Sequence, residues 1–477
     1  MNMTVHKNLI GGTWVEGVDV APNLNPSNPD QIVGEFVRGD TASVDAAVAA
    51  ARAALPGWSG ASPQVRHDVL EAAGAAIIAR KDEIGRLLSR EEGKTLAEGI
   101  AETVRAAQIF KFFAGEALRL AGDILPSIRP NIDVLVEREP VGVVGLITPW
   151  NFPIAIPAWK VAPALAYGNC VILKPADLTP ACAWQIASIL DEAGCPGGVF
   201  NLVMGRGNSV GARIVEHPGI DAVSFTGSAP TGRSMGVRCA ELGKKVQLEM
   251  GGKNPMVVLD DADLETAVNA SLNGAFFSTG QRCTASSRLI VTEGIHDAFV
   301  ATLTDLAAKL QVGDALDPET QIGPVVDQSQ LDQNLGYIQL AKDEGCEVSG
   351  GTVMDGPGFF QQPAVFAKAT NEMRVSREEI FGPCASVIKV GDYEEALAVA
   401  NDTEFGLSSG ICTTSLKHAN HFRRHAQAGM VMVNLPTAGV DYHVPFGGRK
   451  GSSYGPREQG SYAREFYTTV KTSYVLP

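Results

Sequence analysis

Residues 222–253 read AVSFTGSAPTGRSMGVRCAELGKKVQLEMGGK, and this stretch decides the fold class. The apolar run 222–225 is typical of a buried strand, a turn with two glycines follows, and residues 230–242 have the length of a helix. Residues 246–249 then form a second strand-like run. A strand, a glycine turn, a helix and a second strand make a βαβ unit. Such units predict a parallel sheet that is covered by helices.

The same alternation extends along most of the chain. Before the quoted stretch, the pattern is strand-like at 170–173, helix-like at 180–193, strand-like at 199–203 and helix-like at 208–216. A second alternating region runs from residue 256 to residue 433. The sequence therefore predicts two α/β regions rather than one.

The ends of the chain depart from this alternation. Residues 41–121 are rich in alanine and predict helices with a break around Pro56 and Pro63, whereas residues 134–147 are rich in β-branched side chains and predict strands. The last strand-like run, 466–475, stands alone. It needs a sheet to join, in this chain or in another subunit.

The composition excludes several classes of protein. The chain has 477 residues, 45% of them hydrophobic, and at roughly 150 residues per domain we expect about three domains. Its 39 Lys and Arg against 53 Asp and Glu give a net charge of -14, which argues against a nucleic acid or an anionic membrane as partner. No apolar run is long enough to predict a membrane span. Residues 1–12 lack a secretory pattern and none of the eight cysteines forms CxxC, so we expect a cytoplasmic protein without structural disulfides.

Two glycine-rich turns lie between a strand and a helix. Residues 205–211 form GxGxxxG, one residue away from the common dinucleotide fingerprint, and residues 227–232 read GSAPTG. Glycines let the backbone approach a phosphate, and the helix that follows offers free N–H groups. Either turn alone is equally consistent with an ordinary βα connection. Two in succession favour a dinucleotide.

One histidine pattern raises the question of a metal. His418, His421 and His425 lie on one face of a predicted helix, but no acidic ligand accompanies them and two arginines are adjacent. A solvated basic face is therefore favoured over a zinc site, and we predict no bound metal.

Residues 276–285, FFSTGQRCTA, contain the strongest candidate for a nucleophile. Cys283 follows Arg282 and precedes small polar residues suited to a helix start, an environment that lowers a thiol pKa. The alternative is a buried structural cysteine. Upstream, Glu249 follows a strand and is a candidate general base, and the alternative is a carboxylate that points to water.

Together these segments resemble the NAD(P)-dependent aldehyde dehydrogenase superfamily. The resemblance covers essentially the whole chain, and the motifs occur in the family's order and spacing. They are PWNFP at 149–153, KPAD at 174–177, FTGS at 225–228, LEMGGK at 248–253, GQRC at 280–283, EIFGP at 379–383 and PFGG at 445–448. Within the superfamily, residues 433–445 and 451–460 are most similar to the bacterial enzymes that act on 2,5-dioxopentanoate.

The resemblance implies an architecture. We expect a Rossmann-like parallel-sheet domain for NAD(P) from residues 1–121 and 142–251, and an α/β catalytic domain from residues 252–450. Residues 122–141 and 451–477 would form a small β oligomerisation element that joins a homodimer or homotetramer.

The resemblance also implies roles for single residues. Cys283 attacks the aldehyde, Asn151 and the backbone N–H of Cys283 stabilise the oxyanion, and Glu249 activates the water that hydrolyses the thioester. The resemblance counts Lys174 among the catalytic residues. It also implies that Lys174 and Asp177 contact the adenosine ribose of the cofactor. The other implied cofactor contacts are Thr148, Pro149, Trp150, Pro175, Ala176, Gly207, Gly211, Phe225, Gly227, Ser228, Met250, Gly251, Glu379 and Phe381.

Asp177 bears on the choice of cofactor. Its carboxylate accepts hydrogen bonds from a ribose 2′-hydroxyl and repels a 2′-phosphate, which favours NAD. Because Asp is shorter than Glu, space remains for a 2′-phosphate that Lys174 would bind. We therefore predict NAD as the main cofactor, with tolerance of NADP.

The implied substrate is 2,5-dioxopentanoate, oxidised to 2-oxoglutarate. The alternatives are succinic semialdehyde or another aliphatic aldehyde, and a non-enzymatic relative is disfavoured by the intact candidate catalytic residues. A substrate carboxylate needs a cation. Arg105 and Arg282 are the candidates for this cation. Arg105 could instead form a salt bridge on the surface. Arg282 belongs to the motif GQRC, which also occurs in related enzymes that act on other substrates. The remaining predicted substrate contacts are Phe152, Ile156, Trp159, Phe277, Thr284 and Phe446.

Overall fold

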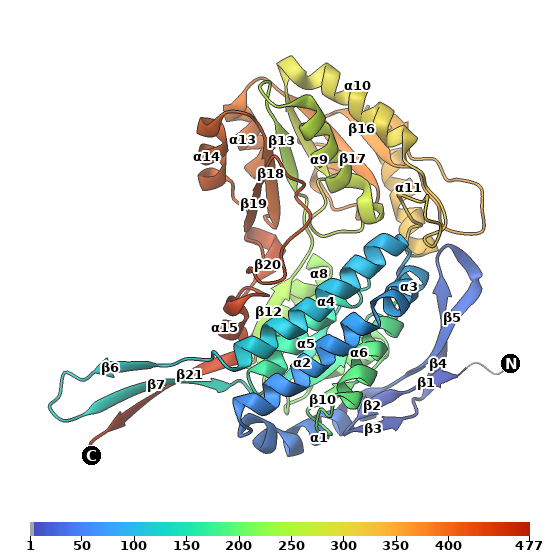
Figure 1. Cartoon of the computed structure of the whole chain (residues 1–477). Helices are drawn as coiled ribbons and strands as arrows, with labels where there is room; N and C mark the ends of the chain where they lie inside the picture. The colour runs from blue at the N-terminus through green and yellow to red at the C-terminus, as the bar shows by residue number, and fades with distance from the viewer. Residues whose placement is uncertain (1–3) are drawn as a thin grey trace.

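The computed structural model describes residues 4–477, which form two α/β lobes and a projecting β-arm (Figure 1). The blue-to-green lobe lies below the yellow-to-red lobe in this view, and the arm extends to the lower left. The arm consists of β6 (Asp123–Pro126), β7 (Asp133–Pro140) and β21 (Thr468–Val475). A smaller sheet on the other side of the lower lobe joins β1 (Val5–His6), β5 (Asn28–Arg38) and β4 (Asp19–Asn25).

An eight-stranded sheet forms the centre of the lower lobe. Its order is β20 (Ser453–Tyr454), β12 (Lys245–Glu249), β11 (Ala222–Thr226), β8 (Val143–Ile147), β9 (Cys170–Lys174), β10 (Phe200–Leu202), β2 (Asn8–Ile10) and β3 (Thr13–Val15). The five central strands, β12 to β10, run parallel, which confirms the predicted βαβ units. Every residue of β8, β9 and β11 is buried, as expected for a parallel sheet that helices cover.

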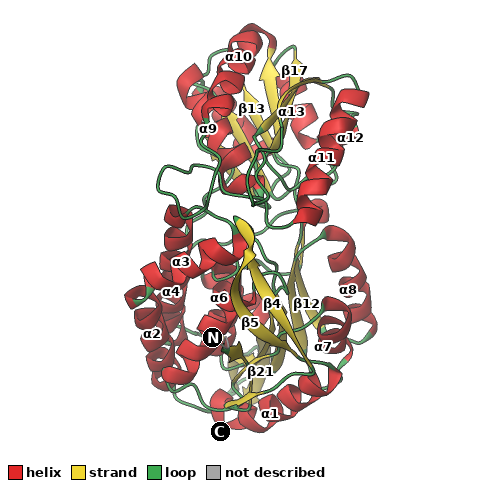
Figure 2. Ribbon diagram, turned by 90° about the vertical axis from the view of Figure 1, so that its right-hand side faces the viewer, coloured by secondary structure: helices red, strands yellow, loops and turns green. Residues whose placement is uncertain are grey.

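Helices α1 to α8 cover the sheet of the lower lobe (Figure 2). They are α1 (Thr41–Ser59), α2 (Pro63–Ala79), α3 (Lys81–Glu92), α4 (Leu96–Ala117), α5 (Ala155–Ala166), α6 (Pro180–Glu192), α7 (Ala212–Glu216) and α8 (Ala229–Glu241). The predicted break around Pro56 and Pro63 is confirmed, although α1 continues through Pro56 and ends only before Gly60. A proline in the last turn removes a single helix hydrogen bond. Pro63 does begin α2, where its missing N–H costs nothing.

A seven-stranded sheet forms the centre of the upper lobe and confirms the second alternating region. Its order is β15 (Glu347–Gly350), β16 (Ala364–Ala369), β17 (Cys384–Val390), β14 (Arg288–Thr292), β13 (Pro255–Val258), β18 (Ser408–Cys412) and β19 (Met430–Val433). All of these strands run parallel except β15. The accompanying helices are α9 (Leu264–Phe276), α10 (Glu293–Lys309), α11 (Gln328–Asp343), α12 (Arg374–Arg377), α13 (Tyr393–Asn401) and α14 (Leu416–His425).

The end of the chain differs from its prediction. Residues Arg464–Tyr467 form the short helix α15, so the last strand begins at Thr468. It pairs antiparallel with β7 of its own chain, from Thr468 opposite Pro140 to Val475 opposite Asp133. Just before it, residues 453–454 form β20 and return to the edge of the eight-stranded sheet. The segment after residue 450 therefore contributes to both the arm and the lower lobe.

The arrangement of the two sheets places the candidate site. The segments after β8, β9, β11 and β12 all lie at the carboxyl edge of the lower sheet, where ligands bind in parallel α/β sheets. The Cys283 segment and the Glu379 segment precede β14 and β17 of the upper sheet. The site thus lies between the lobes. No helix within residues 4–477 combines the length and apolarity that a membrane crossing requires.

Candidate active site

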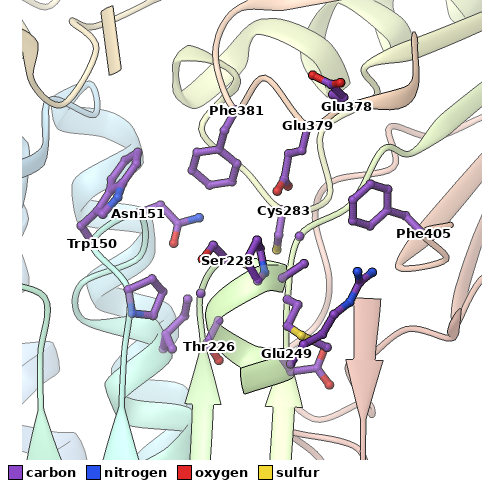
Figure 3. Close-up of a pocket in the computed structure, with 18 of the residues that line it drawn as sticks. Trp150, Asn151, Thr226, Ser228, Glu249, Cys283, Glu378, Glu379, Phe381 and Phe405 are labelled. Carbon is purple, nitrogen blue, oxygen red and sulfur yellow. The ribbon is translucent and has the colours of Figure 1, made fainter. Parts of the chain in front are cut away.

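Two cavities meet at Cys283. One has a volume of about 470 Å³ and the other about 320 Å³, and both are lined by Cys283, Trp159 and Phe446. Figure 3 shows the larger cavity, with Glu379 above Cys283, Ser228 below it and Asn151 to its left. A thiol between two cavities can meet one ligand from each side.

The loop that carries Cys283 has an unusual backbone. Ser278, Thr279 and Gly280 have φ values of 52°, 56° and 65°. Residues other than glycine rarely adopt this left-handed backbone conformation. Glu98 of α4 holds this turn, because its Oε1 accepts from the Ser278 backbone N–H and hydroxyl, both at 2.9 Å. The same oxygen pairs with Arg282 Nη2 at 3.1 Å. A strained backbone conformation of this kind persists only where surrounding contacts hold it. The turn leads the chain to Cys283 at the two cavities.

The predicted environment of the Cys283 thiol is wrong. No helix starts after Cys283, since residues 283–287 form a turn and coil before β14. Arg282 is directed to Glu98. Burial raises the pKa of Cys283 to about 12, and the nearby carboxylates of Glu379 and Glu249 add to this increase. The resting side chain is therefore a neutral thiol, and its attack on an electrophile requires a proton acceptor.

Asn151 lies beside the Cys283 loop. It follows β8, is buried, and donates from Nδ2 to the Gln281 carbonyl at 3.0 Å. An asparagine amide has two N–H donors, so the second remains for a ligand. The structure thus brings together Asn151 and Cys283, as the sequence predicted.

Glu249 ends β12 and lines the larger cavity. Its Oε2 accepts from the Ser453 hydroxyl at 2.5 Å. Burial, together with the charge of Glu458, raises the pKa of Glu249 well above its usual value. A carboxylate with a raised pKa is suited to accept a proton near neutral pH.

Glu379 faces Cys283 from the other lobe. Its Oε1 accepts from the Gly252 backbone N–H at 2.9 Å, and burial raises its pKa to about 7. The carboxylate packs so closely on the turn after β12 that a Cβ at Gly251 would meet Oε2 at 2.0 Å. A larger side chain at this position would therefore displace the Glu379 carboxylate.

The larger cavity collects about half of the predicted cofactor residues. Pro149, Trp150, Gly227, Ser228, Met250, Gly251, Glu379 and Phe381 line it. The Trp150 and Phe381 rings meet edge to face, with centroids 5.4 Å apart. The sequence missed several residues that also line the cavity and belong to no quoted motif, namely Arg233, Gln330, Gln333, Tyr337, Glu378, Glu404 and Phe405.

The other predicted cofactor residues lie further along the sheet edge. Lys174 is buried, donates to the Pro175 carbonyl at 2.8 Å and lies next to Gly211. Ala176 and Asp177 line a small groove with Gly205. Thr148 and Phe225 are buried in or beside the strands, and the predicted helix at 208–216 begins as a π-helix over Gly207–Gly211. Lys174 lines neither cavity at Cys283, so the structure does not bring it to the other candidate catalytic residues.

The smaller cavity collects most of the predicted substrate residues. Arg105, Phe152, Trp159, Arg282, Thr284 and Phe446 line it, while Ile156 lines the larger cavity. Phe277 lines neither cavity; it packs against the core of the upper lobe, because the left-handed turn begins directly after it. The sequence also missed three residues of α4 and the turn before it, Lys94, Glu98 and Glu102. The spacing of Glu98, Glu102 and Arg105 places these three residues on one face of α4, a signal that the sequence contains.

Arg105 differs from the other cations of the smaller cavity. Lys94 pairs with Glu102 at 2.8 Å and Arg282 with Glu98 at 3.1 Å. Arg105 bonds only the neutral Gln459 side chain, at 3.2 Å, and its buried Nε has no hydrogen-bond partner among the described residues. The proposed surface salt bridge is therefore wrong for Arg105. Arg105 is half-buried, makes no salt bridge within residues 4–477, and experiences the charges of Glu102 and Asp441 at longer range. An arginine without a salt bridge is suited to an anionic ligand.

The histidine pattern forms an exposed stack. The His421 and His425 rings lie 3.9 Å apart on α14 and are solvent-exposed, and Tyr393 stacks on His418. Within residues 4–477, no group of three or more His, Cys, Asp or Glu side chains is placed to hold a metal ion.

Comparison with known proteins identifies the class. The profile of the Aldehyde dehydrogenase family matches residues 14–473, and the chain belongs to this family. It is 44% identical to an alpha-ketoglutaric semialdehyde dehydrogenase of Bacillus subtilis, over 98% of each chain. It is 45% identical to an alpha-ketoglutarate semialdehyde dehydrogenase of Haloferax volcanii, again over 98% of each chain. Among solved structures, a betaine aldehyde dehydrogenase of Staphylococcus aureus in complex with NAD+ matches with a TM-score of 0.96 and 33% identity, covering 99% of this chain and 94% of that one.

Proposed function

We propose that this protein oxidises 2,5-dioxopentanoate, which is alpha-ketoglutaric semialdehyde, to 2-oxoglutarate with NAD. The observation that carries the proposal is the meeting of two cavities at Cys283, one of which contains the unpaired cation Arg105. The names of the two relatives with 44% and 45% identity support the same substrate. The Arg105 guanidinium would repel the cationic substrate of a betaine aldehyde dehydrogenase, which disfavours that activity.

The larger cavity fits the nicotinamide end of NAD. Glycines at 227 and 251 leave room where side chains would collide with Phe225 and Glu379, and Glu379 presents carboxylate oxygens that accept from ribose hydroxyls. The Thr226 hydroxyl is buried in this wall without a partner among the described residues. When bound there, NAD supplies the hydride acceptor for the oxidation.

The adenosine end would extend along the sheet edge. There Lys174 and Asp177 would meet the ribose, with Gly207, Gly211 and Ser228 near the adenine and phosphates. Thr148, Pro175, Ala176 and Phe225 shape the same edge. Asp177 favours the 2′-hydroxyl of NAD, and tolerance of NADP stays part of the proposal.

The chain's own residues would perform the acyl chemistry at the boundary of the cavities. The Cys283 sulfur attacks the aldehyde carbon and gives up its proton, which Glu249 is suited to take because its pKa is raised. The second N–H of the Asn151 amide and the backbone N–H of Cys283 stabilise the hemithioacetal oxygen. In the oxidation to the thioester, the hydride would pass to bound NAD and Glu249 would release its proton to solvent. Glu249 would then deprotonate the water that attacks the thioester, so that the Cys283 sulfur leaves and the acid is released. Arg105 would hold the distant carboxylate of the substrate throughout.

We further propose how the chain is organised and where it acts. Residues 1–121 and 142–251 would form the NAD-binding domain and 252–450 the catalytic domain. Residues 122–141 and 451–477 would form the oligomerisation element of a homodimer or homotetramer. The exposed apolar side chains of the arm support subunit contact; they include Ile124, Leu125, Ile128, Val470 and Leu476. The free state of all eight cysteines supports a cytoplasmic location.

An aldehyde panel tests the proposed function. We expect kcat/KM to be highest with 2,5-dioxopentanoate and NAD, lower with succinic semialdehyde, and lower again with pentanal, as followed by absorbance of the reduced cofactor. Cys283→Ala, the control, should abolish turnover with all three. A preference for neutral aldehydes, or turnover by Cys283→Ala, would refute the proposal.

A further inference from the structure

The segment that carries Asn151 lacks local support. It joins β8 to α5, and the residue that precedes the first turn of α5 is Ile154, whose side chain makes no capping hydrogen bond. The first N–H groups of a helix have no partner inside the helix. This helix start is buried, so its N–H groups need an acceptor from another part of the chain.

Glu102 of α4 supplies that acceptor. Its Oε1 accepts from the backbone N–H groups of Ile154 at 3.2 Å and Ala155 at 3.1 Å. Its Oε2 accepts from Lys94 Nζ at 2.8 Å. The Lys94 and Glu102 side chains are only 2% and 3% exposed, so water does not weaken these charge-assisted bonds.

Lys94 holds the other end of the same segment. Its Nζ donates to the backbone carbonyl of Asn151 and lies 3.6 Å from the centroid of the Phe152 ring. The Lys94–Glu102 pair therefore fixes the backbone at Asn151 and again at Ile154 and Ala155. This contact determines where the Asn151 side chain starts and how it reaches Gln281 and Cys283.

We propose that Lys94 and Glu102 are positioning residues for the oxyanion-binding amide of Asn151. The proposal rests on the function proposed above for Asn151. The pair acts through the backbone, because its hydrogen bonds go to the backbone of residues 151, 154 and 155. An oxyanion donor is effective only when it is held in place before the reaction. A shift of about 1 Å costs up to about 100-fold in rate.

Glu102→Gln changes the pair least. The Gln amide oxygen can still accept from Ile154 and Ala155, but its NH₂ group cannot accept from Lys94. Lys94→Met combined with Glu102→Gln removes both charges of the pair together. It also removes the cation that lies 3.9 Å from the buried Glu92 carboxyl. For both variants we expect kcat/KM for the aldehyde to fall about 10- to 100-fold. Should the double variant not fold, Glu102→Gln alone decides.

Two measurements separate positioning from a general loss of structure. Iodoacetamide alkylates a thiol without forming an oxyanion, so its rate with Cys283 should stay within about twofold of the unchanged protein, as should the dissociation constant for NAD. When Lys94→Met and Glu102→Gln are added to a protein that already carries Asn151→Ala, kcat/KM should fall by a further factor of less than about two. The amide that the pair positions is absent from that protein. Independent, multiplicative losses would overturn the proposal.

Glu91→Gln is the matched control. Glu91 caps α6 in the same manner, since it accepts from the Ala181 and Cys182 backbone N–H groups at 2.9 and 2.8 Å and is buried. It should leave kcat/KM at saturating NAD unchanged. An unchanged kcat/KM in Glu102→Gln would overturn the positioning role. An unchanged kcat/KM in Asn151→Ala would instead refute the proposed function.

Discussion

The two cavities that meet at Cys283 differ in charge. Four carboxylates and one cation line the larger cavity: Glu249, Glu378, Glu379, Glu404 and Arg233. Three cations and two carboxylates line the smaller one: Lys94, Arg105, Arg282, Glu98 and Glu102. The nicotinamide ring of NAD is cationic and the proposed substrate is anionic. Each cavity therefore has the sign of charge that suits the ligand we assign to it, although the whole chain has a net charge of -14.

The difference teaches that net charge does not predict the charge of a site. In the smaller cavity, two of the three cations form salt bridges with carboxylates of α4, whereas Arg105 forms none within residues 4–477. In the larger cavity, burial raises the pKa values of Glu249 and Glu379 above those of exposed carboxyls. Local pairing and burial, rather than composition, determine the field at Cys283.

Substitution of Arg105, the cation of the smaller cavity that forms no salt bridge, should have the largest effect on kcat/KM. Arg105→Met should lower kcat/KM for 2,5-dioxopentanoate about 10- to 100-fold, because a hydrogen bond between charged groups contributes about 1.5–3 kcal/mol. Activity with pentanal should be nearly unchanged. Lys111→Met is the control on the same helix, since Lys111 is exposed and pairs with Glu71. Equal losses with both aldehydes would refute the carboxylate role of Arg105.

A change of pH should have a smaller effect, confined to the larger cavity. The pKa of Glu379 is about 7, so this carboxyl is mostly protonated below pH 7 and ionised above it. Only the ionised form accepts hydrogen bonds with both oxygens. The dissociation constant for NAD should therefore fall by about threefold to tenfold between pH 6 and pH 8, as measured by tryptophan fluorescence. Glu379→Gln should flatten this dependence, and a dependence that persists would assign it to another group.

Asp177 should have the smallest effect, because it lies outside both cavities. Asp177→Asn removes the charge that repels a 2′-phosphate, and the ratio of kcat/KM for NADP to that for NAD should rise about twofold to threefold. The ratio comes from initial rates with each cofactor at a fixed aldehyde concentration. A strong preference of the unchanged protein for NADP would contradict the role given to Asp177.

The parts of the site that follow strand ends could be predicted from the sequence. Asn151, Ser228 and Glu249 each follow a strand of one parallel sheet, and the carboxyl ends of such strands lie along one edge. The βαβ alternation fixes that edge before any coordinates are known. The motifs then indicate which residues stand there.

The environment of Cys283 could not be predicted in this way. Its thiol pKa depends on Glu379 and Glu249, which are 96 and 34 residues away in sequence and come from opposite lobes. The strained turn at Ser278 and Thr279 depends on Glu98, which no nearby motif indicates. Phe277 points into the upper core for the same reason. Tertiary contacts between distant segments decide these features, and local patterns do not contain them.

Trapping of the acyl group tests the central claim most directly. In Glu249→Gln, attack and oxidation should be slower because Glu249 no longer takes the Cys283 proton, but the thioester that forms should persist because the base for its hydrolysis is missing. Rapid mixing with NAD and 2,5-dioxopentanoate should give a burst of about one reduced cofactor per subunit, then little further turnover. Mass spectrometry should find the acyl group on the peptide that contains Cys283. Steady turnover without an adduct, or an adduct on another residue, would contradict the account.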